Sequence, residues 1–308
     1  MTHRIVFAGT PEFAAAILKA LIPKAQYSIV AVYTQPDRPA GRGRKPTQSP
    51  VKELALQCGL PVRQPASLKD PEEIRRLAGL DSDLMVVVGY GQILPRAILD
   101  TPRQGCINVH ASLLPRWRGA APIQRAILAG DVETGVTIMR IVEALDAGPI
   151  LCQSACTIGP NDTAAVLHDR LAELGAKCLL DTLDNILNGR VQPAPQDEQL
   201  VTHAPKIERA EAHLDWKEPA VQLARKVRAF NLKPVSYAEL QGLEIRVWEA
   251  IAIDGATCQP PGTVLPTQHH CLDVATGEGL LRLLKVQLPG RRAVSAADFL
   301  NGHPNFIK

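Results

Sequence analysis

Asn108 and His110 are the first residues of this chain whose types and spacing suit chemistry. They lie two positions apart at the end of the apolar run 105–109, which predicts a buried strand. Side chains at alternate positions of a strand share one face. An amide donor beside a titratable imidazole suits acyl-type chemistry, because the amide stabilises an oxyanion and the imidazole moves protons. A buried histidine is also often a purely structural group, and that alternative stays open here.

Two nearby segments carry further candidates. Asp146 lies in the turn 143–149, where an aspartate is usually a turn former. If this turn folds over the end of the strand with Asn108, the Asp146 carboxylate would orient His110 and stabilise its charged form. The run Arg116-Trp117-Arg118 is either a clamp for a phosphate or acidic ligand or a cationic surface turn.

A charged segment at 34–45 has no hydrophobic periodicity. It is either a solvated loop or an arm that meets phosphates and base edges. Its four basic residues are Arg38, Arg42, Arg44 and Lys45.

Alternating strands and helices must position these groups. Helical patterns separate most of the apolar runs, and this alternation predicts an α/β fold with a doubly wound, mostly parallel sheet. In the first strand-to-helix turn we expect Thr10 to be the N-cap and Pro11 the first helical residue. This turn lacks the Gly-x-Gly-x-x-Gly pattern, which argues against a nucleotide-dependent dehydrogenase. The expected strands cover 4–8, 28–33, 84–88, 105–109, 137–141 and 150–156.

The amino-acid composition changes after residue 189. The stretch 190–199 is polar, contains two prolines and is typical of a linker. A short amphipathic helix at 220–230 and five short strand-like runs after it predict a small β-barrel. The predicted organisation is therefore a catalytic domain over 1–189, a linker over 190–206 and a second domain over 207–308.

The composition limits the class of protein. The chain has 308 residues, 46% of them hydrophobic, and a net charge of +3, which is compatible with an RNA partner without requiring one. We find no apolar run long enough for a membrane helix and no signal-peptide layout. The seven cysteines are scattered and lack zinc-site spacing, so we expect reduced thiols, no metal and a cytoplasmic location.

Motifs along nearly the whole chain resemble those of the methionyl-tRNA formyltransferase family. The Asn-x-His strand with Ser-Leu-Leu-Pro is shared across folate-dependent formyltransferases, and the arginine-rich loop and the C-terminal half narrow the resemblance to the tRNA enzymes. The matching segments are 8–13, 34–43, 88–95, 108–124, 133–139, 145–148, 206–216 and 228–231.

The resemblance implies that a formyl group passes from 10-formyltetrahydrofolate to the α-amine of methionine on initiator tRNA. It implies a formyltransferase, Rossmann-like catalytic domain and an OB-like C-terminal domain that supports the tRNA. Asn108, His110 and Asp146 would be the catalytic residues of a monomeric enzyme. The implied folate-binding residues are Val88, Gly89, Tyr90, Gly91, Ser112, Leu113, Leu114 and Pro115, and the implied tRNA-binding residues are Arg38, Arg42, Arg44 and Lys45.

The sequence departs from the family pattern at two places, and three alternative functions stay open. Leu232-Lys233 replaces Pro-Trp, which puts an aromatic contact there in doubt, and Pro149 replaces an acid, which stiffens the loop with Asp146. One rival is a formyltransferase for another acceptor, such as a sugar nucleotide, which would not need the arginine-rich loop. A second is a deformylase, for which we would expect an additional N-terminal domain. A third is a non-catalytic RNA-binding protein.

Overall fold

The computed structural model describes residues 2–40, 45–231, 233–255, 258–265, 271–304 and 306. The chain divides into two compact units. Unit 1 contains 1–122, 133–157 and 168–204, and unit 2 contains 123–132, 158–167 and 205–308.

A seven-stranded sheet forms the centre of unit 1, in the order β10-β9-β7-β6-β1-β2-β5. The pairs among β5, β2, β1, β6 and β7 are parallel, and β9 and β10 are antiparallel, so the expected doubly wound, mostly parallel sheet is confirmed. The strands are β1 (His3–Gly9), β2 (Tyr27–Tyr33), β5 (Val62–Arg63), β6 (Leu84–Val88), β7 (Cys106–His110), β9 (Glu133–Arg140) and β10 (Ile150–Thr157).

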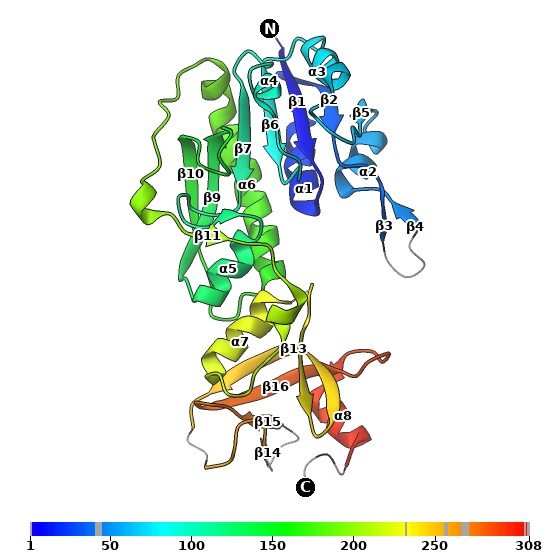
Figure 1. Cartoon of the computed structure of the whole chain (residues 1–308), viewed down its shortest axis with the longest axis vertical. Coiled ribbons are helices and arrows are strands. Elements are labelled where there is room, and N and C mark those ends of the chain that lie inside the picture. Colours follow the sequence, from blue (N-terminus) through cyan, green and yellow to red (C-terminus); the bar gives the residue numbers. More distant parts are fainter. Residues whose placement is uncertain are drawn as a thin grey trace. The chain divides into compact units, whose positions relative to one another are not determined.

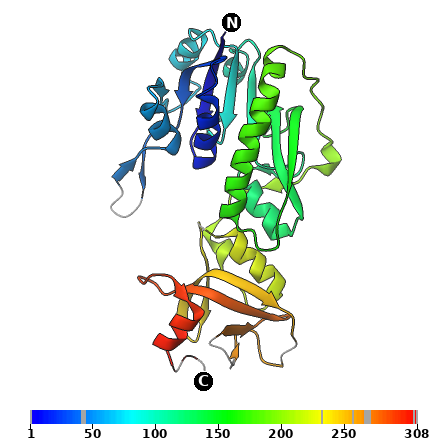
Figure 2. The same cartoon turned by 180° about the vertical axis from the view of Figure 1, so that it is seen from behind.

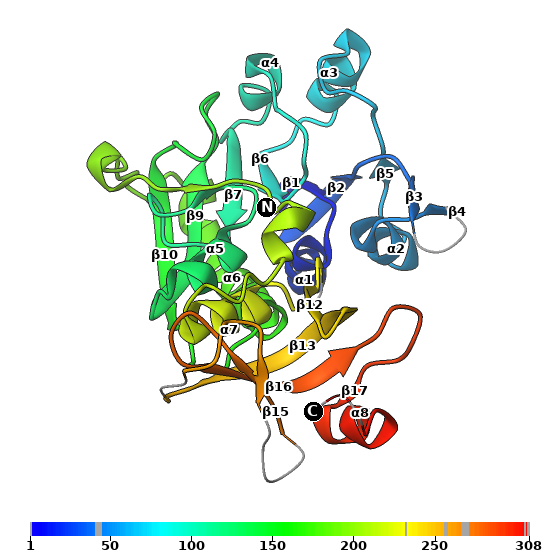
Figure 3. The same ribbon diagram turned by 60° about the horizontal axis from the view of Figure 1, so that its bottom comes forward.

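Helices cover both faces of this sheet, which explains why β6 is buried at all five positions. Helices α1 (Glu12–Leu21) and α6 (Ala164–Leu187) lie on one face, seen from that side in Figure 2. Helices α3 (Pro71–Ala78) and α4 (Arg96–Leu99) lie on the other (Figure 3), where Leu77 and Ile98 pack into a core with residues of β1, β2 and β6.

Three more elements of unit 1 lie at its margins. Helix α2 (Pro50–Gln57) begins at Ser49, whose side chain accepts from Lys52 N–H, an N-cap that fixes its first turn. The charged segment contains a short antiparallel ribbon, β3 (Arg38–Ala40) and β4 (Lys45–Thr47), drawn beside α2 in Figure 1. The two-residue strands β8 (Arg118–Gly119) and β11 (His203–Ala204) pair in parallel.

Unit 2 contains a curled antiparallel sheet that forms a half-barrel, consistent with the OB-like domain that the family resemblance implies. The order is β12-β13-β16-β15-β14, with β17 beside β16. All five strand-like runs of the sequence are present. The strands are β12 (Ser236–Leu240), β13 (Leu243–Ile253), β14 (Val264–Leu265), β15 (Leu272–Ala275), β16 (Leu280–Gln287) and β17 (Val294–Ser295).

Helices complete unit 2. Helix α7 (Ala220–Ala229) packs on the sheet through Leu223 and Val227, and α8 (Ala296–Gly302) adds Phe299 to the same core. Most of helix α5 (Pro122–Ala129) also belongs to this unit. Two short 3₁₀ turns, Glu198–Leu200 and Arg209–Ala212, fall in unit 1 and unit 2 respectively. The signals for the short helices α4 and α8 were not recognised in the sequence.

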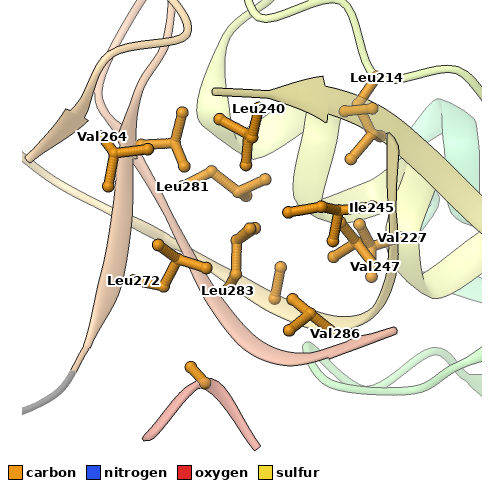
Figure 4. Packing of buried hydrophobic residues seen from close by; sticks show 14 of the residues in the cluster. Leu214, Val227, Leu240, Ile245, Val247, Val264, Leu272, Leu281, Leu283 and Val286 are labelled. Atoms are coloured by element: carbon orange, nitrogen blue, oxygen red, sulfur yellow. The ribbon is translucent and has the colours of Figure 1, made fainter. Parts of the chain in front are cut away.

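The core of unit 2 allows a stability prediction. Leu283 of β16 is fully buried among Leu240, Leu272 and Leu281 (Figure 4), whereas its neighbour Leu284 is 39% exposed. We expect Leu283→Ala to lower the free energy of unfolding by about 2–5 kcal/mol, because it removes buried methyl groups and leaves a cavity. Urea unfolding followed by tryptophan fluorescence measures this. Leu284→Ala is the matched control and should change it by less than about 0.5 kcal/mol; equal losses would contradict the assigned core.

Candidate active site

The carboxyl ends of β6 and β7 bring the candidate groups to one edge of the sheet. Val87 of β6 pairs with Asn108 of β7, and on the other side of β7 His110 pairs with Thr137 of β9. The strand order reverses direction of growth between β1 and β6, and α/β proteins bind ligands at such switch points beyond the carboxyl ends of the strands. The expected strand with Asn108 and His110 is present as β7, which lies beside β6 and so next to this switch point.

His110 is held between two groups from loops. Its ring Nε2 lies 2.9 Å from the carbonyl oxygen of Trp117, and because a carbonyl only accepts, Nε2 donates in this contact. Its Nδ1 lies 3.7 Å from Oδ2 of Asp146, so the turn with Asp146 does fold over the strand end. The same carboxylate oxygen accepts from the N–H of Gly119 at 2.8 Å. The His110 residue is 6% exposed.

Both residues that face the His110 ring nitrogens, Trp117 and Asp146, have an uncommon backbone conformation. Trp117 has φ of 66° and Asp146 has φ of 49°, in the left-handed region. This conformation costs a non-glycine residue of the order of 1 kcal/mol or more, so surrounding bonds must maintain it. Gly119 is required between them, because a Cβ there would lie 2.7 Å from the backbone oxygen of Ala204.

The side-chain amide of Asn108 is not used by the fold. Within the described ranges it forms no hydrogen bond, and the residue is partly exposed. An amide donor with this freedom, two residues from a buried imidazole, is able to bind a developing negative charge on a substrate.

The segment after His110 is fixed by polar side chains of β9 and β10 and by its own Ser112. Thr137 Oγ1 donates to the Ser112 carbonyl (2.7 Å) and accepts from Leu114 N–H (3.0 Å), while Gln153 donates to the Leu114 carbonyl (2.8 Å). Ser112 is fully buried, and its hydroxyl donates to the Arg116 carbonyl at 2.6 Å. Leu114 is also buried, so Leu113 and Pro115 are the partly exposed side chains here.

The loop after β6 is held by its backbone. The Tyr90 carbonyl accepts from Thr10 Oγ1 and from Gln35 Nε2, each at 3.0 Å. Gly89 and Gly91 are exposed, while Val88 and Tyr90 are buried, and burial raises the pKa of the Tyr90 hydroxyl. The prediction of Thr10 as a helix cap was wrong, because its hydroxyl binds this loop instead. Pro11 is the N-cap of α1, with no side-chain cap bond.

The charged segment is anchored at its base. Asp37 accepts from Lys52 (2.7 Å) and Gln64 (2.8 Å), and these bonds lower the pKa of its carboxyl group. Arg38 is exposed on β3. Arg42, Arg44 and the side chain of Lys45 lie outside the described residues.

Neither interpretation of Arg118, surface turn or ligand clamp, was right. Arg118 is 6% exposed, binds Glu198 through both terminal nitrogens and donates from Nε to Gln196. The guanidinium lowers the pKa of the Glu198 carboxyl group. Arg116 instead lies over the Trp117 ring, 4.5 Å from its centroid.

Sequence reasoning missed Thr137 and Gln153, as well as the role of Gln196. Thr137 lies opposite His110 in the antiparallel pair, so strand alternation on β9 was the available signal. Gln196 lies in a polar, proline-containing stretch that gave no signal of any contact.

The described residues contain neither a cluster suited to a metal ion nor a helix suited to a membrane. In the described part of the chain, no group of three or more His, Cys, Asp or Glu residues is placed to hold a metal ion. Among the helices of that part, none has the length and apolar character needed to cross a membrane.

Two family models and several curated relatives match this chain over nearly its whole length. A family model described as formyl transferase matches residues 3–183, and one described as its C-terminal domain matches 206–304. A methionyl-tRNA formyltransferase of Methylococcus capsulatus is 59% identical over 300 residues, covering 97% of each chain. That of Nitrosococcus oceani is 55% identical over 300 residues, covering 97% of this chain and 93% of the relative.

Solved structures share the fold at low identity. An N-formyltransferase from Helicobacter canadensis, solved with folinic acid and dTDP-3-aminofucose, has a TM-score of 0.68 at 17% identity, covering 92% of this chain and 98% of that one. HypX from Aquifex aeolicus also has a TM-score of 0.68, at 18% identity, and this chain spans 49% of its length. On the strength of the relatives above 50% identity and the two family models, this chain belongs to the methionyl-tRNA formyltransferase family.

Proposed function

We propose that this enzyme transfers the formyl group of 10-formyltetrahydrofolate to the α-amine of methionine on initiator tRNA, for translation initiation. The observation that carries the proposal is the constellation of Asn108, His110 and Asp146 beyond the carboxyl end of β7, in a chain 59% identical to a methionyl-tRNA formyltransferase. We propose these three residues as the catalytic residues.

The chemistry follows from these three side chains. The amine attacks the formyl carbon, and the carbonyl oxygen becomes an oxyanion that accepts a hydrogen bond from the Asn108 amide. His110 removes a proton from the attacking amine and delivers one to the folate nitrogen as the carbon–nitrogen bond breaks. The Asp146 carboxylate orients the ring and stabilises its transient positive charge. The step requires no metal and no covalent bond between substrate and enzyme.

His110 has to exchange one contact for this reaction. Both of its ring nitrogens face protein groups, the Trp117 carbonyl at Nε2 and the Asp146 carboxylate at Nδ1. The acceptor amine therefore replaces the Trp117 carbonyl at Nε2. The ring hydrogen moves from Nε2 to Nδ1, where it faces the Asp146 carboxylate, so that Nε2 can accept the amine proton.

We propose that the donor binds between the loops after β6 and β7. The exposed backbone around Gly89 and Gly91 suits a flat heterocycle, as do the partly exposed Leu113 and Pro115. Ser112 and Leu114, like Val88 and Tyr90, are buried and set the shape of these loops.

The assignment is tested by formyl transfer to methionine charged on initiator tRNA, beside elongator tRNA and a reaction without acceptor. Transfer to the initiator alone is expected. Folate turnover without tRNA would identify a hydrolase, and transfer to another amine would identify a formyltransferase of different acceptor.

The arginine-rich segment is proposed to bind the acceptor end of the tRNA through Arg38, Arg42, Arg44 and Lys45. We expect Arg42→Ala to raise the KM for the tRNA about tenfold, the effect of one lost charged hydrogen bond, and to leave the KM for the folate unchanged. Steady-state kinetics with each substrate varied in turn measure this. Arg75→Ala, an exposed arginine on α3, is the control. Equal increases for both substrates would remove Arg42 from tRNA binding.

The domain organisation, the oligomeric state and the cellular location are part of the same proposal. We propose residues 1–189 as the catalytic domain, 190–206 as a linker and 207–308 as the tRNA-binding domain, supported by family matches over 3–183 and 206–304. We also propose a monomer in the cytoplasm. The seven cysteines, all among the described residues, form no disulfide with one another, which suits a reducing compartment. Gel filtration tests the monomer.

A further inference from the structure

Residues 190–204, here called the strap, follow α6 and contact both loops that touch His110. The strap pairs with the sheet edge where Ile150 and Ala194 exchange two backbone bonds, of 2.7 and 2.9 Å. Further on, Thr202 Oγ1 accepts from Trp117 N–H (2.9 Å) and the Thr202 carbonyl accepts from Arg118 N–H (2.9 Å). Figure 1 shows this yellow-green segment passing from the end of α6 beside β10 to β11.

Gln196 of the strap binds the loop that carries Asp146. Its Nε2 donates to the Asp146 carbonyl and to the Gly148 carbonyl, each at 2.8 Å, and its Oε1 accepts from Arg118 Nε at 3.0 Å. Both amide hydrogens and the amide oxygen are therefore engaged.

Arg118 links this amide to the other partner of His110. The residue before it, Trp117, provides the carbonyl at Nε2, and the residue after it, Gly119, donates to the Asp146 carboxylate. Because Arg118 is buried and also bound to Glu198, its Nε has little freedom to leave Gln196. One amide thus connects the two loops that face the two nitrogens of the imidazole.

The two loops need such a connection. Trp117 and Asp146 both have left-handed backbones, which surrounding contacts must maintain. The 3.7 Å between Nδ1 and Oδ2 is longer than a hydrogen bond, so the electrostatic effect of the carboxylate depends on where the loop is held.

We propose that Gln196 is a positioning residue for His110: by binding the Asp146 and Gly148 carbonyls and Arg118, it fixes the Asp146 carboxylate at the imidazole. The expected loss of kcat rests on the proposed function. The position of the Asp146 carboxylate at the His110 ring does not depend on the substrate.

Two substitutions test this role. Gln196→Glu keeps the size and an acceptor for Arg118, but places an oxygen instead of an NH₂ group against two carbonyls. Gln196→Met removes the polar contacts without adding charge. The matched control is Gln199→Glu on the same strap, since the Gln199 side chain is exposed and has no hydrogen bond among the described residues.

The kinetic readout separates positioning from binding. We expect both Gln196 variants to lower kcat about 10- to 100-fold, the scale of a displacement near 1 Å at a catalytic group. The KM values for folate and tRNA should stay within about twofold, because Gln196 is proposed to act on the chemical step and not on the binding of either substrate. Gln199→Glu should match the unchanged enzyme.

A second readout does not need activity. Nuclear magnetic resonance of isotope-labelled histidine, with His110 assigned from a His110→Ala sample, should show altered His110 ring-nitrogen signals in both Gln196 variants and unaltered signals in Gln199→Glu. Unchanged His110 signals in both Gln196 variants would overturn the inference, whatever happens to kcat. If the unsubstituted enzyme transfers no formyl group, the proposed function fails while this measurement still decides the role of Gln196.

Discussion

His110→Ala is expected to lower kcat by about 10²–10⁴-fold, the usual contribution of a positioned acid–base group. The imidazole lies with Nδ1 toward Asp146 and Nε2 toward Trp117, and alanine provides no group to carry the proton from the amine to the folate nitrogen. The measurement is single-turnover formyl transfer with saturating donor and charged initiator tRNA, which isolates the chemical step.

Binding assays show whether the loss of kcat comes from the chemical step or from weaker substrate binding. Affinity for the tRNA and for the folate should be retained, because neither the arginine-rich segment nor the loop after β6 is altered. His3→Ala is the control, since His3 begins β1 and therefore lies at the amino end of that strand, the edge opposite the site. Full activity of His110→Ala would remove His110 from the chemical step, and loss of tRNA affinity would point to a structural role.

Asn108→Ala is expected to lower kcat about 10²–10³-fold, or about 2.7–4 kcal/mol of transition-state stabilisation, as for other single oxyanion donors. The amide forms no hydrogen bond within the described structure, so its removal leaves no protein group unpaired and the melting temperature should hold. Steady-state kinetics should show kcat falling with KM for both substrates nearly constant.

Asn108→Asp tests whether the reaction needs the N–H donor of Asn108 or only a side chain of its size. It has nearly the same shape but offers no N–H at neutral pH and adds negative charge beside the oxyanion, so its kcat should fall at least as far as that of the alanine variant. An active Asn108→Asp enzyme, or a loss confined to KM, would contradict the oxyanion role. In the double variant with His110→Ala, the losses should be less than additive, because the two groups act on one step.

Much of this architecture could be predicted from local patterns. The fully apolar run 84–88 appeared as β6, buried on both faces, and the five short runs after residue 235 appeared as strands of unit 2. Asn108 and His110 were found because strand alternation is a two-residue property that one sequence displays.

The remaining features depend on contacts between distant segments. Thr10 has the signature of a helix cap, yet its hydroxyl binds a carbonyl 80 residues away. Arg118 looks like a surface cation but is buried by an acid and an amide from the strap. The partners of Gln196 on the Asp146 loop are backbone carbonyls, which every residue type possesses, so no sequence pattern records them.

The strap shows that the end of the family match and the end of the segment that supports the site are different residues. A chain ending at residue 189 would contain Asn108, His110 and Asp146, and the first family match ends even earlier, at 183. Yet such a chain would lack Gln196, Thr202 and the β11 backbone against which Gly119 is packed. The shortest chain that retains every described contact around the histidine therefore ends at Ala204, where the polypeptide leaves unit 1. Truncation studies that locate the autonomous catalytic fragment should be designed from that end point.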